Sequence, residues 1–230
     1  MAKKTVFVTG TDTEVGKTMV SAAILEAAKT AGKRALGMKP IASGCENTPE
    51  GLRNEDALIL QQAATETLAY DLVNPIALEP AIAPHVAAAQ AGRTVSAGRL
   101  VGFCRGMQMR PVDLLLIEGA GGWRVPLNER ETYSAVPREL GVPVVLVVAL
   151  RLGCINQALL TAEAIRNDGL VLAGWVANHA EPAVMSCEQE TLDYLMEHIG
   201  APCLGVIPWI EGAEPEILSG YLDVDVLFEN

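Results

Sequence analysis

Basic residues are scarce in this chain: 17 lysines and arginines stand against 28 aspartates and glutamates, for a net charge of −11. Nucleic-acid backbones attract basic surfaces, so we expect no nucleic-acid partner. Long apolar runs are also missing, since the longest, 142–150, is far shorter than the roughly 20 residues of a membrane helix. The first residues show no cleavable targeting pattern. We therefore predict a cytoplasmic protein with no membrane partner.

Paired cysteines are absent too. The five cysteines are an odd number at irregular spacing, and the three histidines show no metal-ligand spacing to them. This pattern is typical of a reducing compartment and excludes a disulfide framework or a zinc site.

What is present favours one α/β domain. Half of the 230 residues are hydrophobic and a fifth are charged, which is a globular composition long enough for one domain and slightly short for two. We predict strands at 5–10, 34–38, 113–117, 142–150, 170–177 and 203–207, helices at 19–31, 55–63, 87–92, 96–109, 134–140, 155–167 and 186–198, and a loop at 41–49. Such alternation predicts a mostly parallel sheet with helices on both faces, and we take 1–230 as a single domain.

The first strand leads into a glycine-containing loop, and Gly16, Lys17 and Thr18 stand where a helix begins. This is the layout of a phosphate-binding P-loop, in which backbone amides and the helix N-terminus hold phosphate. Lys17 is expected on phosphate oxygens and the Thr18 hydroxyl on Mg²⁺. Five residues separate Gly10 from Gly16 where the usual pattern has four. The alternative is an ordinary turn with a surface lysine.

Other polar groups follow the remaining predicted strands. Because ligands bind at the carboxyl ends of parallel strands, these groups are expected along one rim of the sheet. They are Lys39, Glu118, Gly153–Asn156, Asn178 and Pro208.

Two carboxylates suit a magnesium site, because Mg²⁺ prefers hard oxygen ligands and needs only one or two of them beside phosphate and water. Glu118 follows a purely apolar strand, and Asp56 lies in the first turn of a predicted helix. Asp56 could instead simply complement the helix dipole. Lys39 could stabilise charge that develops during phosphoryl transfer or could reach solvent.

Two segments offer backbone groups to a ligand. Gly119–Gly122 lacks large side chains and permits close approach, or is a flexible turn. Gly153–Asn156 opens a helix whose amides suit a carboxylate or phosphate, or is a plain connection. These features predict a magnesium-dependent nucleotide-binding domain, and they name no substrate.

The chain resembles the dethiobiotin synthetase family almost from end to end, including the five-residue loop spacing. The segments that carry the resemblance are GTDTEVGKT at 10–18, GMKPIASG at 37–44, TPEGLRNEDAL at 48–58, IEGAGGW at 117–123, LGCINQALLTAEAI at 152–165, GWVAN at 174–178 and IPW at 207–209. The resemblance implies a cytoplasmic homodimer that converts 7,8-diaminononanoate, CO₂ and MgATP to dethiobiotin, ADP and phosphate in biotin synthesis. A carbamate would form on one amine, ATP would phosphorylate it, and the second amine would close the ring.

The resemblance also implies residue roles. Lys17, Lys39 and Thr13 are catalytic, and Thr18, Asp56 and Glu118 hold the metal. The nucleotide set is Glu14, Val15, Gly16, Lys17, Thr18, Asp56, Glu118, Gly119, Ala120, Gly121, Asn178, Pro208, Trp209, Ile210 and Glu216. The substrate set is Thr13, Lys39, Ser43, Gly153, Cys154, Ile155 and Asn156, the last four from the neighbouring subunit.

The chain departs from the family at three points, one of which is His179, where an acid is often seen. Thr191 stands where the family has a tyrosine that helps to bind the substrate carboxylate, with Tyr194 one turn later. An extra residue near 211–216 leaves open whether Glu214 or Glu216 contacts ribose.

Three other interpretations compete. A partition or cell-division ATPase switch shares the fold, but such proteins usually carry a further lysine early in the loop, which 11–14 lack. A cobyrinate-type synthetase would need a fused glutaminase domain. A nucleotide sensor without catalysis would leave Lys39 and Glu118 unexplained.

Overall fold

The computed structural model describes residues 3–183 and 185–228. Its centre is a six-stranded sheet in the order β10-β9-β8-β1-β7-β2, in which every pair of neighbours is parallel. The strands are β1 (Lys4–Gly10), β2 (Ala35–Met38), β7 (Leu114–Gly122), β8 (Val144–Ala149), β9 (Leu172–Asn178) and β10 (Cys203–Ile207). The predicted fold class is confirmed, and the one-domain assignment for 1–230 stays a prediction.

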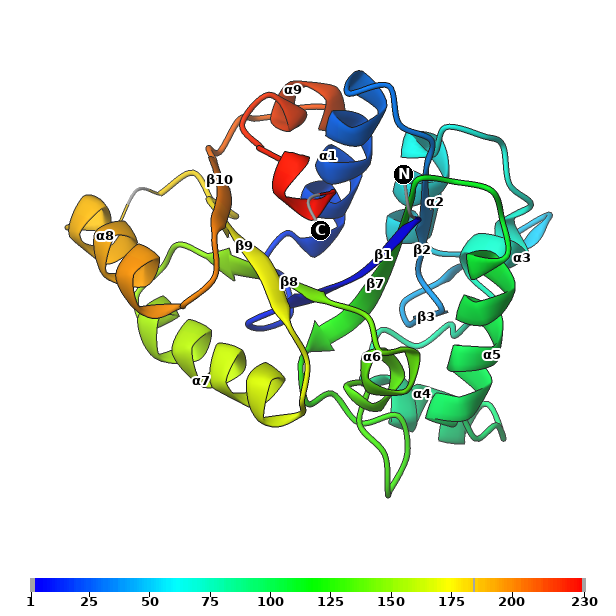
Figure 1. The fold of residues 1–230 in the computed structure, drawn as a ribbon. Coiled ribbons are helices and arrows are strands. Elements are labelled where there is room, and N and C mark those ends of the chain that lie inside the picture. The colour runs from blue at the N-terminus through cyan, green and yellow to red at the C-terminus, as the bar shows by residue number, and fades with distance from the viewer. Residues whose placement is uncertain (1–2, 184, 229–230) are drawn as a thin grey trace.

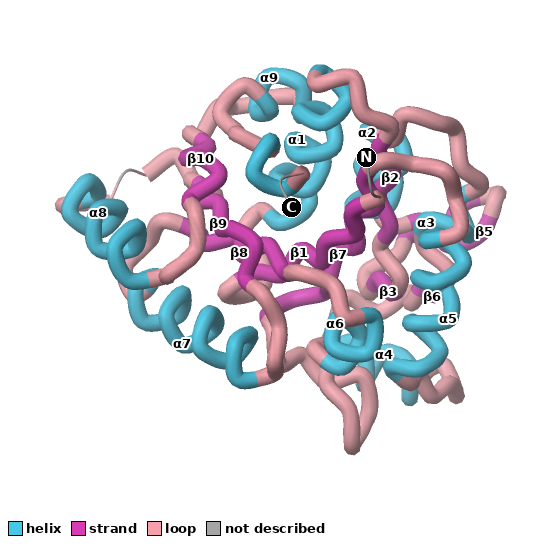
Figure 2. Tube along the Cα trace, in the orientation of Figure 1, coloured by secondary structure: helices cyan, strands magenta, loops and turns pink. Residues whose placement is uncertain are grey.

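Helices cover both faces of this sheet. Figure 1 shows α1 and α9 on one face and α6 and α7 on the other, and Figure 2 shows the same layers as a tube. The helices are α1 (Lys17–Thr30), α2 (Glu55–Ala63), α3 (Tyr70–Val73), α4 (Pro84–Gln90), α5 (Ala97–Gln108), α6 (Ala135–Leu140), α7 (Cys154–Asn167), α8 (Glu188–His198) and α9 (Pro215–Ser219), with a 3₁₀ turn at Asp225–Leu227. None of the helices in the described ranges is long and apolar enough to cross a membrane.

The strands are apolar because both sides of the sheet are covered. All six residues of β8, VVLVVA, are buried, as expected for a central strand of a parallel sheet. Under β1, the Phe7 ring packs edge-on against Trp123 and Tyr133, with ring centroids 6.2 and 5.5 Å away. The core thus extends to the strand end from which the glycine-containing loop departs.

The predicted loop at 41–49 is wrong in part. Ile41–Ala42 forms β3, which pairs with β6 (Ile76–Ala77), and β4 (Glu46–Thr48) forms a hairpin with β5 (Gly51–Arg53). These ladders are two or three residues long, so they carry no periodic signal. Their effect is to tie the segment after β2 to the body of the protein.

Two further boundaries differ from the prediction. Strand β7 does not end at residue 117 but continues through the glycines, where Gly122 pairs with Gly10. Helix α4 begins at Pro84, three residues before the predicted start, because proline is favoured in the first turn of a helix.

The connections place the loop after β1 at the point where the strand order reverses. The chain leaves β1 for β2 beyond β7 on one side, whereas β8, β9 and β10 extend the sheet on the other. Parallel sheets bind ligands at this point. The predicted rim is confirmed in part: Lys39 and Pro208 directly follow β2 and β10, and Asn178 ends β9, whereas Glu118 lies within β7 instead of after it.

Candidate active site

The P-loop opens helix α1 without any side chain capping it. Gly16 is the N-cap residue at φ 82°, and the first turn of α1 contains no acidic residue. A Cβ atom at Gly16 would collide with the side chain of Asn178, whose amide donates a 2.9 Å hydrogen bond to the Val15 carbonyl. The helix N-terminus is therefore left with free amides, which suit an anion such as phosphate.

The side chains of Lys17 and Thr18 point in different directions. Lys17 Nζ donates to the Asp12 carbonyl at 2.9 Å. Thr18 Oγ1 donates to Glu118 Oε1 at 2.9 Å. The structure thus places the lysine across the loop and the hydroxyl toward β7.

Lys39 meets both predicted metal carboxylates. Its Nζ atom lies 2.6 Å from Asp56 Oδ2 and 2.6 Å from Glu118 Oε1. Glu118 is 0 % exposed, and its second oxygen, Oε2, has no hydrogen-bond partner. Lys39 does not reach solvent, so that alternative is wrong, and Asp56 does more than complement the dipole of α2.

Burial and the neighbouring charges in this cluster shift the pKa values of its members. Burial lowers the pKa of Lys17 to about 8, although Glu118 opposes the shift. Burial also disfavours charge on Lys39, but Glu118 and Asp56 outweigh burial and raise the pKa of Lys39. Burial acts against the Asp56 carboxylate, yet Lys39 outweighs it and lowers the pKa of Asp56. Lys39 is therefore held as an ammonium between two carboxylates.

The donor set fits a magnesium ion bound together with phosphate. Thr18, Asp56 and Glu118 supply hard oxygens, and the unpartnered Oε2 of buried Glu118 is available to a ligand. Among the described residues no group of three or more histidine, cysteine, aspartate or glutamate side chains could hold a metal alone. Mg²⁺ ordinarily completes its shell with phosphate and water, so two carboxylates and a hydroxyl suffice.

Local capping places Asp56. Asn54 is the N-cap of α2, and its side-chain oxygen accepts the Ala57 amide at 3.3 Å. This contact satisfies one of the amides that have no partner within the helix. The next acidic residues, Glu55 and Asp56, then fall in the first turn, and Asp56 faces Lys39.

The glycines of Gly119–Gly122 belong to strand β7, so the alternative of a flexible turn is wrong, and their approach to a ligand stays a prediction. A Cβ atom on Gly121, at φ 61°, would lie 3.4 Å from Thr13 Oγ1. Across the cluster, the Ser43 hydroxyl is buried without a partner. Ser43 thus has an unpaired hydroxyl, and Gly121 lies close to Thr13.

The first turn of α7 lies on the same rim, beside β8. Gly153 is its N-cap at φ 94°, no side chain caps it, and its first turn has no acidic residue. Cys154 is buried, whereas Asn156 is exposed. Here again a helix N-terminus is left without a capping side chain.

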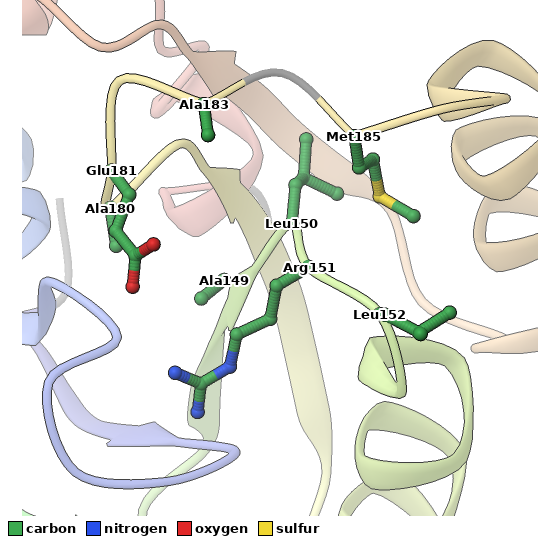
Figure 3. A pocket seen from close by; sticks show the side chains of 8 residues that line it. All are labelled: Ala149, Leu150, Arg151, Leu152, Ala180, Glu181, Ala183 and Met185. Atoms are coloured by element: carbon green, nitrogen blue, oxygen red, sulfur yellow. The ribbon is translucent and has the colours of Figure 1, made fainter.

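Figure 3 shows the cavity between this turn and the loop after β9. Its volume is about 150 Å³, and Arg151, Leu152, Glu181 and Met185 are among its lining residues. The Arg151 guanidinium reaches toward the P-loop, where it lies 3.5 Å from Asp12 Oδ2. Sequence reasoning missed Arg151, although an arginine directly after an apolar strand was a usable signal.

The last part of the rim lies beside β9 and β10. Ile207 pairs with Asn178, so Pro208 follows directly beside the end of β9. Trp209 is 45 % exposed, and Glu214 and Glu216 are exposed at the start of α9. The strand pairing therefore brings Pro208 to the side of the P-loop that carries Asn178, whereas Glu214 and Glu216 lie at the start of α9, which packs against α1.

Comparison with known proteins identifies relatives over the whole chain. A family model described as an AAA domain matches residues 4–216. The ATP-dependent dethiobiotin synthetase BioD of Marinobacter nauticus is 74% identical over 234 residues and covers 100% of both chains. The enzyme of the same name from Cellvibrio japonicus is 54% identical over 229 residues, again with 100% coverage of both.

Solved structures of low identity share the fold. The MinD cell division protein of Aquifex aeolicus superposes with a TM-score of 0.57 at 13% identity, covering 98% of this chain and 95% of that one. A ParA family ATPase from Chlorobium tepidum gives 0.53 at 14% identity, covering 95% and 89%. At such identities the likeness shows the fold alone. Full-length identity of 74%, in contrast, establishes that this chain belongs to the ATP-dependent dethiobiotin synthetase family.

Proposed function

We propose that the chain uses MgATP to join CO₂ to 7,8-diaminononanoate and to close the ureido ring of dethiobiotin, releasing ADP and phosphate in biotin synthesis. One observation carries this proposal. Beside the P-loop, a buried lysine bridges two carboxylates at 2.6 Å, and one of these accepts the Thr18 hydroxyl. The names of the relatives supply ATP and dethiobiotin, the family resemblance suggests the other substrates, and this cluster offers groups for a phosphoryl transfer step.

The proposed chemistry needs a carbamate oxygen to attack the terminal phosphorus of ATP. A carbamate oxygen leaves poorly until it is phosphorylated, and only then does the second amine displace it at the carbonyl carbon. Lys17 and Lys39 carry ammonium groups that stabilise the charge spread over the transferring oxygens. Thr13 lies beside them, next to Gly121.

We assign the metal to Thr18, Asp56 and Glu118. Bound there with ATP, Mg²⁺ would neutralise charge on the β- and γ-phosphate oxygens. Since Lys39 lies on both carboxylates in the ligand-free chain, its ammonium must then exchange one or both contacts for substrate oxygens.

The nucleotide contacts are proposed from the loop outward. The P-loop from Glu14 to Thr18 and the strand residues Gly119–Gly121 face the phosphates, and Asn178 with Pro208–Ile210 receives adenine. Trp209 supports this, because an exposed indole offers an aromatic face. Glu216 is assigned to ribose, with Glu214 as the alternative.

The diamine is proposed to lie between two subunits. Thr13, Lys39 and Ser43 of one chain contact the carbamate end, and the amides of Gly153–Asn156 of the other hold the carboxylate. Leu152, just before α7, is 95 % exposed, and Leu160, on α7, is 57 % exposed; a second copy would cover them. Thr191 donates to the Cys187 carbonyl of its own helix, whereas Tyr194 is half exposed.

The dimer has its own test. Replacing Leu152 and Leu160 by aspartate should convert a dimer into monomers in sedimentation experiments and weaken diamine binding. Met109→Asp is a matched control, since Met109 is 85 % exposed but lies at the end of α5. Identical sedimentation of all variants would reject this interface.

We also propose a cytoplasmic location and no nucleic-acid or membrane partner. The five cysteines are free thiols in the structure, which suits a reducing compartment. ATP as a co-substrate supports the same location.

The decisive experiment measures phosphate release with MgATP, bicarbonate and the diamine. We expect release only when all are present, with dethiobiotin formed in equal amount. ATP hydrolysis that the diamine does not change would instead favour an ATPase switch of the kind that shares this fold.

A further inference from the structure

A chain of buried hydrogen bonds lies behind the lysine of the site. The Lys39 carbonyl accepts Asn74 Nδ2 at 2.7 Å, and Asn74 Oδ1 accepts the Tyr70 hydroxyl at 3.1 Å. The Tyr70 oxygen accepts the backbone N–H of Asn54 at 2.7 Å. This series of hydrogen bonds therefore links Lys39, which carries the ammonium, to Asn54, which caps α2.

At Asn54 the hydrogen-bond network divides into two branches. Its side-chain oxygen caps α2, the helix that carries Asp56. Its side-chain nitrogen donates to the Ser43 carbonyl at 3.3 Å. One asparagine thus holds both a proposed metal ligand and a proposed substrate contact relative to Lys39.

The network is enclosed and nearly saturated. Asn74 is 2 % exposed, and Tyr70 and Asn54 are also buried. Burial raises the pKa of Tyr70, so its hydroxyl stays protonated and donates to Asn74. The Arg53 guanidinium lies 4.2 Å from the centroid of the Tyr70 ring. In such surroundings the loss of one partner leaves others unpaired at a high cost.

Both backbone groups of Lys39 are held from the α3 segment. Its N–H donates to the Val73 carbonyl at 2.8 Å, and its C=O accepts Asn74. Lysine has a long flexible stem, so the position of its backbone decides which oxygens its ammonium can reach.

We infer that Tyr70 and Asn74 are positioning residues for phosphoryl transfer, which hold Lys39 in register with Asp56 and Ser43 without touching substrate. This inference rests on the proposed function. A displacement of about 1 Å in such a group can reduce turnover by about 100-fold.

Tyr70→Phe tests the inference, because it keeps the ring and removes only the hydroxyl. We expect kcat to fall at least tenfold while KM for ATP stays within about twofold of the unaltered chain, since the P-loop is untouched. Ser96→Ala is the matched control: it removes the N-cap of α5, a helix that carries no site residue. It should lower the thermal midpoint and leave kcat unchanged.

Asn54→Ser tests the second branch and remains informative if Tyr70→Phe does not fold. Serine still caps α2 but cannot donate to the Ser43 carbonyl. KM for the diamine should rise at least fivefold with KM for ATP unchanged.

The inference is overturned if Tyr70→Phe keeps kcat within twofold at a temperature where it is folded. It is equally overturned if Asn54→Ser leaves the diamine KM unchanged, or if Ser96→Ala loses as much kcat as Tyr70→Phe. Absence of diamine-dependent turnover in the unaltered chain would instead reject the proposed function, so the two failures are distinct.

Discussion

Lys39 Nζ and Glu118 Oε1 lie 2.6 Å apart, and the Glu118 side chain has no exposed surface. The negative charge of Glu118 is therefore balanced by the Lys39 ammonium before any nucleotide or metal binds. The lysine therefore has two duties. It compensates charge in the ligand-free protein, and in the proposed reaction it stabilises the transferring phosphoryl group.

Lys39→Ala should lower kcat by about 100-fold and change the Kd for ATP by less than about threefold. The interaction of Lys39 strengthens as charge develops in the transition state, so its loss falls on turnover. Steady-state kinetics and calorimetric titration with ATP measure the two effects. Lys29→Ala on α1 is the control, because Lys29 is half exposed in the last turn of the helix, where it pairs with Glu26. Unchanged turnover in Lys39→Ala would remove Lys39 from the mechanism.

Lys17→Met should stabilise the ligand-free fold at pH 7 while abolishing tight ATP binding. The pKa of Lys17 falls from 10.5 to about 8 on burial, a shift that corresponds to roughly 3 kcal/mol. Loss of the hydrogen bond to the Asp12 carbonyl offsets about 1 kcal/mol of this. A net gain of about 2 kcal/mol in the free energy of unfolding is expected from urea denaturation.

The same variant predicts a pH dependence. Between about pH 8 and 10.5 the unfolded chain keeps a proton on Lys17 that the folded chain has lost, so stability due to this group rises with pH. Lys17→Met should lack that rise. Equal slopes for both proteins across this window would contradict the pKa of Lys17.

Gly153→Glu should weaken diamine binding at least tenfold and leave ATP binding intact. A carboxylate placed at the N-terminus of α7 would repel the substrate carboxylate that we assign to its amides. Gly169→Glu, just beyond the other end of α7, is a matched control, because both glycines have positive φ and open space at Cβ. Normal diamine affinity in Gly153→Glu would reject the assignment of the carboxylate.

Cys104 should resist thiol reagents at pH 8, whereas exposed Cys187 reacts. Burial raises the pKa of Cys104 to about 12, and the thiolate is the reactive form. Peptide mass spectrometry after timed alkylation distinguishes the two cysteines. Urea should abolish the difference, and comparable labelling rates in the native protein would show that α5 opens readily.

Much of the fold could be read from local pattern. Alternating apolar strands and helices, together with Gly16-Lys17-Thr18 at a helix start, predicted a parallel sheet with a P-loop at the carboxyl end of its first strand. Asn54 stands directly before the helix predicted at 55–63, and it caps α2. Where the pattern was too short, it failed: β3 to β6 have two or three residues each, and β3 finds its partner β6 far along the chain.

The residues of the candidate site could be predicted from the sequence, but the contacts between them could not. The sequence placed Lys39 and Glu118 on one rim and Asp56 in the first turn of a helix. Their contacts could not be predicted, nor could the part played by Tyr70 and Asn74. A tyrosine and an asparagine four residues apart have no sequence signature of a buried network.

The amino-acid sequence alone determined which reactive groups this protein carries and which elements they begin or end, because those signals lie in residues close together along the chain. Only the tertiary structure decided which groups meet. By inserting β7 between β1 and β2, the fold places Glu118 between the Thr18 hydroxyl and the Lys39 ammonium, 79 residues from Lys39 along the chain. Strand order, which arises from packing across the whole sheet, sets those distances.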